Sequence, residues 1–294
     1  MRAWGMPARP SGPGRLDVGD IAVDFLPDGA IRHDPAASYP GSSHALWASS
    51  AEYLDEDGRL VMSLGALLVR TGGHTVLVDL GWGPSSSDLV DPTTGAANGR
   101  IEGGQLLDSL AAIGVAPAEV EAVLFSHLHR DHVGWLGDPG HPTFPSATYL
   151  VADAELDHWR GAGRTGIGPA PTAEQLAAVE GRGHAVADGD TPFPGISVLA
   201  TPGHTPGHLS FVLSSGDGRA VVLGDAVHCP VEITEPELAF VVDVDPALAQ
   251  RTRRHLEQEL LRPGTIAAGP HFPDVVFGRL LPGNGRPSWS FTRP

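Results

Sequence analysis

The segment HLHRDH at positions 127–132 constrains the fold of this chain more than any other feature of its sequence. Side chains at i and i+2 point to the same side of an extended backbone, so His127 and His129 can hold one metal ion together. Asp131 and His132 follow as the chain turns, and they can face a second ion. Histidine is the commonest metal ligand in proteins. The segment therefore predicts a metal site rather than a histidine-rich surface turn.

Four apolar segments that read as strands each lead, directly or within a few residues, to a residue type that binds metals. These segments are 121–126, 196–200, 220–224 and 265–269, and they lead to His127, His204, Asp225 and His271. Loops at the carboxyl ends of strands hold functional side chains on a rigid scaffold. We therefore expect seven residues to converge: His127, His129, Asp131, His132, His204, Asp225 and His271.

Five imidazoles and two carboxylates are too many ligands for one tetrahedral zinc ion. They suit two ions about 3.5–4 Å apart, bridged by a carboxylate. We assign three histidines to the first ion, an aspartate and two histidines to the second, and one carboxylate to both. The first set is His127, His129 and His204; the second is Asp131, His132 and His271; the bridge is Asp225. The mixture of nitrogen and oxygen suits Zn²⁺, and iron, manganese and cobalt are alternatives.

Strand-like and helix-like segments intermingle along the chain, which indicates an α/β or mixed α+β class. The 38 glycines and 27 prolines are typical of many short elements joined by turns. Apolar strands flank the Gly72-Gly73 turn, and helices are expected near 106–113, 153–160, 172–181 and 246–262. Residues 67–79 and 211–225 share one pattern of strand, glycine turn, strand and aspartate. A duplicated sheet unit explains this pattern, and chance similarity of two hairpins is the alternative.

Composition excludes several classes of function. A net charge of −16 argues against binding to the phosphate backbone of nucleic acids. No apolar run reaches the length of a membrane-spanning helix, and the first twenty residues lack the apolar core of a signal peptide. The single cysteine, Cys229, excludes an intrachain disulfide and a multi-cysteine metal site. We expect a cytoplasmic globular protein with a small-molecule substrate and no membrane partner; a homodimer stays open.

We expect a single domain over residues 1–294. Its Pro/Gly-rich residues 1–20 are expected to form a loose N-terminal arm, and the loop 160–171 is a candidate lid. Residues 161–166 match a G-x-G-x-x-G pattern, but they follow a helical segment rather than a strand, which argues against a dinucleotide site. The sequence contains no G-x-S-x-G motif for a serine hydrolase. No residues are therefore assigned to an organic cofactor.

Four motifs together resemble the metallo-β-lactamase superfamily in order and spacing. They are HLHRDH (127–132), TPGHTPGH (201–208), LGDAVH (223–228) and GPHF (269–272). The resemblance covers roughly residues 60–275. It implies a four-layer αββα sandwich, with two sheets inside, helices outside and a dinuclear site at one edge. It also implies a metal-dependent hydrolase, in which a hydroxide bridging two ions attacks the substrate.

Within that superfamily the layout is most similar to the N-acyl-homoserine lactonases, which implies an ester or lactone bond in a small molecule. Thioesterases similar to hydroxyacylglutathione hydrolases and phosphotriester or phosphodiester hydrolases are alternatives with the same metal set. Lactam-cleaving relatives generally carry Cys or Ser at the position of Asp225, and flavin-linked diiron reductases carry Glu at that of His129. Both activities are therefore disfavoured. A non-catalytic binding module is a remote alternative, because such proteins usually lose ligands.

Asp131 and His228 are the candidate catalytic residues. Asp131 can handle the proton when the leaving group departs. The lactonases usually place a tyrosine three residues after the bridging aspartate, where this chain has His228, and histidine can donate a hydrogen bond or shuttle a proton. Asp79 and His208 are expected to orient ligands from behind; a turn cap and a core hydrogen bond are the respective alternatives.

Overall fold

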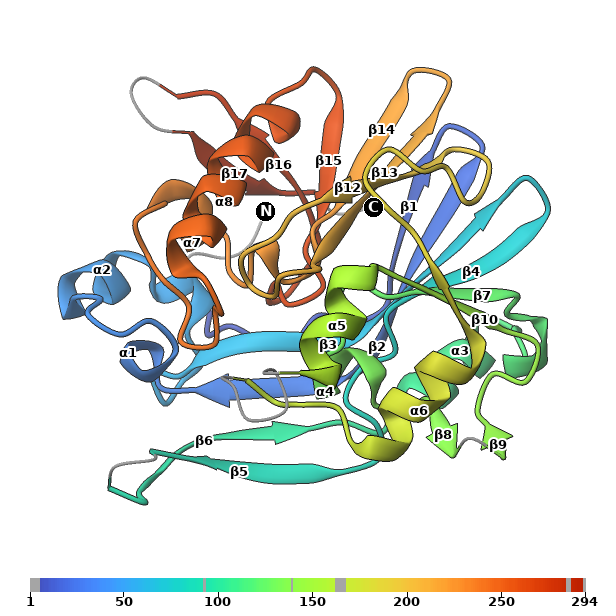
Figure 1. Ribbon diagram of the computed structural model, residues 1–294. Helices are drawn as coiled ribbons and strands as arrows, with labels where there is room; N and C mark the ends of the chain where they lie inside the picture. Colours follow the sequence, from blue (N-terminus) through green and yellow to red (C-terminus); the bar gives the residue numbers. More distant parts are fainter. Residues whose placement is uncertain (1–5, 92–93, 139, 162–167, 284–286, 293–294) are drawn as a thin grey trace.

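Two β-sheets packed face to face form the centre of the molecule, and helices cover their outer faces (Figure 1). The computed structural model describes residues 6–91, 94–138, 140–161, 168–283 and 287–292. The larger sheet has nine strands in the order β11-β10-β7-β4-β3-β2-β6-β5, with β1 paired to β2. The smaller sheet has six strands in the order β12-β13-β14-β15-β16-β17. A separate two-stranded ribbon pairs β8 with β9.

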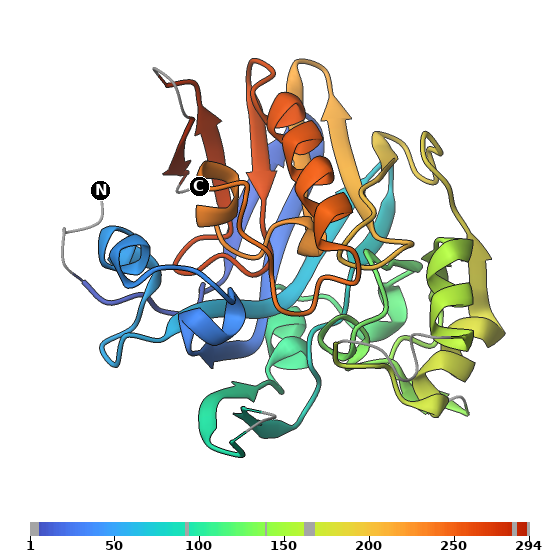
Figure 2. The ribbon, with the colours of Figure 1, turned by 60° about the vertical axis from the view of Figure 1, so that its left-hand side comes forward.

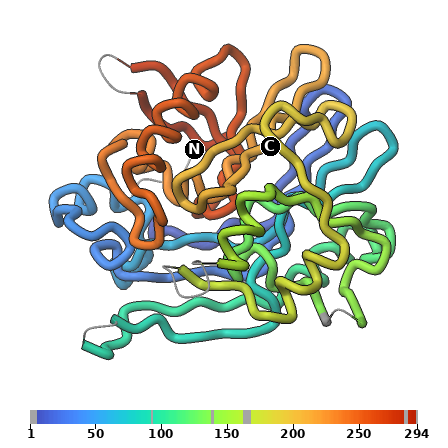
Figure 3. Tube along the Cα trace, viewed as in Figure 1, coloured from blue at the N-terminus to red at the C-terminus, as the bar shows by residue number. Residues whose placement is uncertain are grey.

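The strands of the larger sheet are β1 (Gly14–Val18), β2 (Ile21–His33), β3 (Leu60–Thr71), β4 (His74–Val78), β5 (Ser86–Val90), β6 (Ala97–Glu102), β7 (Ala122–Leu124), β10 (Thr148–Val151) and β11 (Gly183–Ala185). Those of the smaller sheet are β12 (Ile196–Ala200), β13 (Leu209–Ser215), β14 (Gly218–Val222), β15 (Thr265–Ala268), β16 (Phe277–Leu281) and β17 (Ser288–Phe291). The ribbon consists of β8 (Gly137–Asp138) and β9 (His141–Pro142). Figure 3 shows the β5–β6 hairpin, which the sequence did not predict, as the lower edge of the larger sheet.

The helices are α1 (Pro35–Ser38), α2 (His44–Ser49), α3 (Leu106–Ala112), α4 (Arg130–Val133), α5 (Asp153–Arg160), α6 (Ala173–Arg182), α7 (Val231–Thr234) and α8 (Pro246–Leu260), and the 3₁₀ turns are η1 (Ala51–Tyr53), η2 (Pro117–Glu119) and η4 (Gly224–Ala226). The predicted helices correspond to α3, α5, α6 and α8. Their boundaries follow local signals: the Thr172 side chain caps α6 in a capping box with Gln175, and Gly114 just after α3 has φ +73°. Among the described residues, no helix has both the length and the apolar character needed to cross a membrane.

Three apolar clusters produce the four layers. The central cluster lies between the sheets and joins residues such as Phe25 and Leu124 of the larger sheet to Phe211 of the smaller one. A second cluster packs α3, α5 and α6 on the outer face of the larger sheet. A third packs α8 on the smaller sheet through Leu256 and Leu260, and Figure 2 shows α8 lying across that face. The αββα sandwich implied by the sequence is therefore confirmed.

Parallel pairing brings the carboxyl ends of strands from both sheets to one edge. β4 and β7 are parallel, with Val78 opposite Leu124. β14 and β15 are parallel in the smaller sheet, with Val222 opposite Ala268. Chain segments that leave these four strands therefore emerge at neighbouring positions. This edge is where the predicted site residues lie.

The expectation of a loose arm over residues 1–20 is wrong for its described part, residues 6–20. β1 pairs with β2 over five residues. Its Leu16 and Val18 are buried in the central cluster because alternate side chains of a strand face the same way. Upstream, the amide of Ser11 donates to the Ser63 hydroxyl at 2.8 Å.

Asp28 is fully buried in β2 beside a register shift. Its carboxylate accepts five hydrogen bonds of 2.8–3.0 Å from three separate parts of the chain. The donors are the amides of Trp82, Gly83, Gly104 and Leu106 and the indole Nε1 of Trp135. Asp28 therefore ties the loop after β4, the start of α3 and the segment after α4 to one point.

Candidate metal centre

The HLHRDH segment follows β7 at the common edge. The chain is extended at His129, which caps the N-terminus of α4 with φ −60° and ψ 153°. His127 and His129 therefore precede the helix, whereas Asp131 and His132 lie within its single turn. The smaller sheet supplies the remaining side chains from the loop between β12 and β13, from η4 after β14 and from the segment after β15. These are His204, Asp225 and His271.

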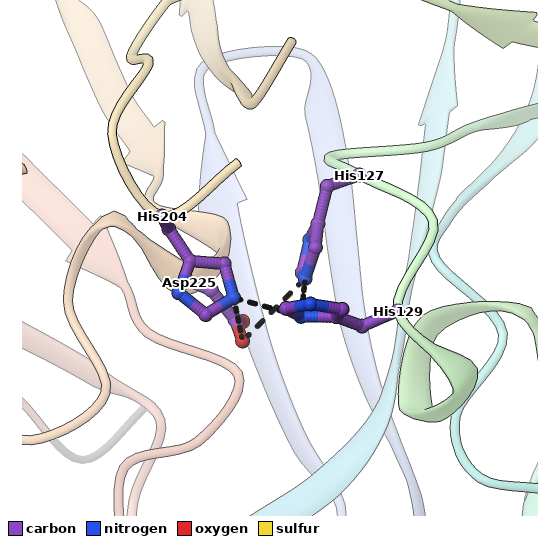
Figure 4. A group of neighbouring side chains, drawn as sticks. All are labelled: His127, His129, His204 and Asp225. Atoms are coloured by element: carbon purple, nitrogen blue, oxygen red, sulfur yellow. Dashed lines mark hydrogen bonds and ion pairs between the residues drawn. The ribbon is translucent and has the colours of Figure 1, made fainter. Parts of the chain in front are cut away.

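Four side chains form the first group of ligand atoms (Figure 4). His129 Nδ1 lies 2.9 Å from His127 Nε2 and 2.9 Å from His204 Nε2. Asp225 Oδ2 lies 3.7 Å from His127 Nε2 and 3.4 Å from His204 Nε2. Ligand atoms at tetrahedral zinc bond lengths lie about 3.3 Å apart. The spacing of this group therefore fits one metal ion.

The second group shares Asp225 with the first. Asp225 Oδ1 lies 2.9 Å from His271 Nε2 and 3.1 Å from His132 Nε2. Asp131 Oδ2 lies 3.7 Å from His132 Nε2 and 3.8 Å from His271 Nε2. Asp225 thus directs one oxygen to each group. The structure brings together all seven residues in the two sets assigned from the sequence, and their role as ligands stays a prediction.

Unpartnered polar atoms support a metal rather than a hydrogen-bonded core. Asp131 Oδ1, His132 Nε2 and Asp225 Oδ1 are buried and have no hydrogen-bond partner in the described part of the chain. Buried polar atoms without a partner are costly and rare. Burial also holds the pKa values of His127, His129 and His204 well below the usual range for histidine. These imidazoles are therefore neutral, the form that binds metal ions.

Contacts to the Nδ1 atoms orient the histidine rings of the HLHRDH segment. Asp79 Oδ2 lies 2.9 Å from His132 Nδ1, the contact expected of Asp79 from the sequence. The same carboxylate accepts hydrogen bonds from the amide and the hydroxyl of Ser126, both at 2.8 Å. Ser126 Oγ in turn lies 3.1 Å from His127 Nδ1. Asp79, which directly follows β4, therefore orients the His132 ring directly and the His127 ring through Ser126. In both rings Nε2 faces the ligand groups.

The histidines of the smaller sheet are held by residues that the sequence analysis missed. His204 Nδ1 lies 3.0 Å from Asp243 Oδ1, and His271 Nδ1 lies 2.8 Å from the carbonyl oxygen of Ser63 in β3. A backbone carbonyl leaves no trace in a sequence pattern, and Asp243 reads there as one of several acidic residues before α8. Neither contact had a signal that could have identified it.

The His208 ring contacts the backbone amide of Asp225, the proposed bridging residue. The Asp225 amide donates to His208 Nε2 at 2.9 Å, and Thr201 Oγ1 lies 2.8 Å from His208 Nδ1. Burial lowers the pKa of His208 to about 3, so the ring is neutral and Nε2 can accept the hydrogen bond. His208 therefore acts from behind the site, as one of its two sequence interpretations proposed.

His228 lies beside the two groups, buried and without a hydrogen-bond partner for either ring nitrogen among the described residues. Its Nε2 is 3.3 Å from Asp225 Oδ2, and its Nδ1 is 3.5 Å from Glu232 Oε2. The ring stacks on Phe240 with centroids 3.6 Å apart. Burial favours the neutral ring, but the carboxylates of Glu232 and Asp225 outweigh it and raise the pKa of His228 to about 10.

The end of the loop 160–171 lies against the first group. A Cβ on Gly168 would lie only 2.3 Å from His129 Nε2, so the backbone packs directly on this ring. The carbonyl of Pro169 accepts a 2.8 Å hydrogen bond from the amide of Arg130 in the HLHRDH segment. Residues 162–167 lie outside the described residues, and a lid formed by this loop stays a prediction.

Comparison with known sequences identifies the family. The sequence profile described as "Metallo-beta-lactamase superfamily" matches residues 66–271. "Metallo-beta-lactamase domain-containing protein 1" of Xenopus laevis is 33% identical over 188 residues, 63% of this chain and 64% of that protein, less than two thirds of its length. An "N-acyl homoserine lactonase" of a Bacillus species is 26% identical over 218 residues, 69% of this chain and 79% of the relative.

Solved structures show the same fold. AidC, described as a dizinc quorum-quenching lactonase in complex with a product, has a TM-score of 0.81 at 23% identity, covering 96% of this chain and 98% of its own. The hydrolase AbOPH, described as a member of the beta lactamase superfamily, has a TM-score of 0.77 at 27% identity with the same coverage. Since the family profile spans most of the chain, this protein belongs to the metallo-beta-lactamase superfamily.

Proposed function

We propose that the chain is a dinuclear metal hydrolase that cleaves an ester or lactone bond in a small molecule. The placement of Asp225 carries this proposal, because its two oxygens face two separate groups of ligand atoms. The two groups of side chains would each hold one cation, and such a pair of cations would supply a hydroxide near neutral pH and polarise the carbonyl under attack. Zn²⁺ is the proposed ion, since the nitrogen-rich set with carboxylates suits it. Iron, manganese and cobalt are the ions to compare with it.

Asp131 is proposed to handle the proton. Its Oδ2 belongs to the second group, whereas its Oδ1 is buried without a hydrogen-bond partner in the ranges that the structure describes. An oxygen free of other contacts can accept a proton from the attacking water. It can then deliver that proton to the leaving oxygen.

His228 is proposed to donate a hydrogen bond to the substrate. Its Nε2 edge faces the bridging Asp225, and Glu232 faces the opposite edge of the ring. Stacking on Phe240 fixes the plane of the imidazole. A donor held in this way stabilises an oxygen on which negative charge develops during the reaction. His228 thus replaces the tyrosine of the lactonases with a different donor.

The lactone is the proposed substrate because relatives named as lactonases align with most of this chain. The direct test is hydrolysis by purified protein loaded with one ion at a time, compared across an N-acyl-homoserine lactone, an aryl ester, a thioester and a phosphotriester. Turnover highest on the lactone with zinc, and lost on chelation, is the expected result. A clear preference for the thioester or the phosphotriester would instead support the alternative hydrolase classes.

Asp225→Ala tests the dinuclear site itself. Loss of the shared ligand should lower the zinc content from two ions per chain and reduce turnover by at least about 10²-fold, because metal polarisation contributes several kcal/mol. Asp17→Ala is the matched control, since Asp17 lies on β1 with 66% of its side chain exposed. Full activity of Asp225→Ala, measured with zinc content, would contradict the mechanism.

A further inference from the structure

Glu155 is a fully buried carboxylate on α5, a helix that contributes none of the seven proposed ligands. Glutamate is almost never fully buried unless it is paired. Arg160, on the same helix, pairs with Asp157 and Glu180 instead. The position of Glu155 in the first turn of a helix is ordinary for an acidic residue, but its burial is not. The contacts of its two oxygens explain why it is retained there.

Each oxygen of Glu155 accepts two hydrogen bonds. Oε1 accepts from the amide of Leu128 at 2.9 Å and from the indole Nε1 of Trp159 at 2.7 Å. Oε2 accepts from the hydroxyl of Thr205 at 2.6 Å and from the amide of Gly207 at 3.2 Å. One carboxylate therefore joins the HLHRDH segment of the larger sheet to the 201–208 loop of the smaller one.

The joined positions are adjacent to ligands of the first group only. Leu128 lies between His127 and His129 in the sequence, and Thr205 directly follows His204. Trp159, held by the same carboxylate, packs edge-on against the His129 ring with centroids 5.5 Å apart. All three histidines of the first group are thus one residue or one ring contact away from a partner of Glu155.

The second group has separate supports. Asp79 contacts His132, and the carbonyl of Ser63 contacts His271. Neither support hydrogen-bonds to Glu155. A change at Glu155 should therefore affect the two metal positions unequally.

The close approach of α5 to the 201–208 loop depends on Gly207. A Cβ at this position would lie 2.2 Å from the backbone nitrogen of Glu155. Because Gly207 has no side chain, α5 can pack against the loop, and the Glu155 carboxylate can reach Thr205 and the Gly207 amide. This is the physical role of the second glycine in TPGHTPGH.

We propose that Glu155 is a positioning residue that holds His127, His129 and His204 in the geometry that retains the first metal ion. The inference rests on the proposed function, because it concerns the same site. Residues that orient metal ligands from behind typically change metal affinity by about 10–100-fold when they are replaced. We expect an effect of this size, confined to one of the two ions.

Glu155→Gln is the sharpest variant. An amide oxygen can still accept from Leu128 and Trp159, but the amide nitrogen would then face the Gly207 amide, which can only donate. Thr205→Val removes one contact to the same carboxylate without touching Glu155, and it should cause a smaller effect in the same direction. Asp157→Asn is the control, since this residue lies on the same helix with its side chain 76% exposed.

The measurement is zinc release to a chromophoric chelator from holoenzyme, together with zinc content and a urea unfolding curve of the metal-free protein. In Glu155→Gln we expect one ion to leave about 10–100-fold faster, the other at the wild-type rate, and a Co²⁺-loaded spectrum altered for one site only. Release of both ions at wild-type rates, or equal acceleration of both, would overturn the inference. If wild-type protein holds a single ion, the dinuclear proposal fails, and the release rate of that ion still decides the role of Glu155. A wild type that holds none would overturn both.

Discussion

Replacing Asp28 with alanine should destabilise the fold strongly although the residue is far from any ligand in the sequence. Three of its five donors, the amides of Trp82, Gly83 and Leu106, form hydrogen bonds in fully buried surroundings. Each buried donor left without a partner costs about 1–3 kcal/mol. Three such donors imply a loss of at least about 3 kcal/mol in the free energy of unfolding, the upper end of the usual range for a single substitution.

Urea unfolding of chelated protein measures this loss without a contribution from metal binding. The midpoint should fall while the dependence of the free energy on urea stays the same, since the surface exposed on unfolding changes little. Asp17→Ala serves as the control, because exposed substitutions usually change stability by about 0.5 kcal/mol or less. A loss below about 1 kcal/mol in Asp28→Ala would refute the reasoning, since it would mean that the donors find other partners.

Two further predictions concern the site. His228→Ala should lower kcat by about 10²–10⁴-fold while both ions are retained; steady-state kinetics with zinc analysis checks this, and unchanged turnover would remove His228 from the mechanism. Asp79→Asn should weaken zinc binding by about 10–100-fold, most strongly at the second position, because Asp79 contacts His132 directly and His127 only through Ser126. Competitive zinc titration measures the affinity, and wild-type affinity would count against this role of Asp79.

The sequence predicts those parts of the site that follow from local patterns. Apolar runs locate the strands, and a ligand residue type just after each run indicates the edge at which they meet. Asp79 was identifiable in this way because it directly follows β4. Asp28, Glu155 and Asp243 were not, because what defines them is a set of donors distant in the sequence, brought near only by the folded backbone. In a sequence, Glu155 is simply an acidic residue near a helix start.

The N-terminal segment departs from its predicted loose arm for the same physical reason. The prolines and glycines in residues 1–20 favour turns, which suggests a loose chain. The local sequence carries no other structural signal there. The two apolar residues of β1, Leu16 and Val18, are too few to form a recognisable strand pattern. Pairing with β2 and burial between the sheets override the local preference.

The division of the ligands between the sheets has a consequence for the whole molecule. Four of the seven proposed ligand side chains come from the larger sheet and three from the smaller one, so bound ions would act as cross-links across the sandwich. Any ligand that binds only the folded state stabilises it, by about 2.7 kcal/mol at a free concentration 100 times its dissociation constant. Zinc supply would then regulate the abundance of the protein as well as its turnover. In a cell short of the ion, a larger fraction of the chains would be unfolded and open to proteases.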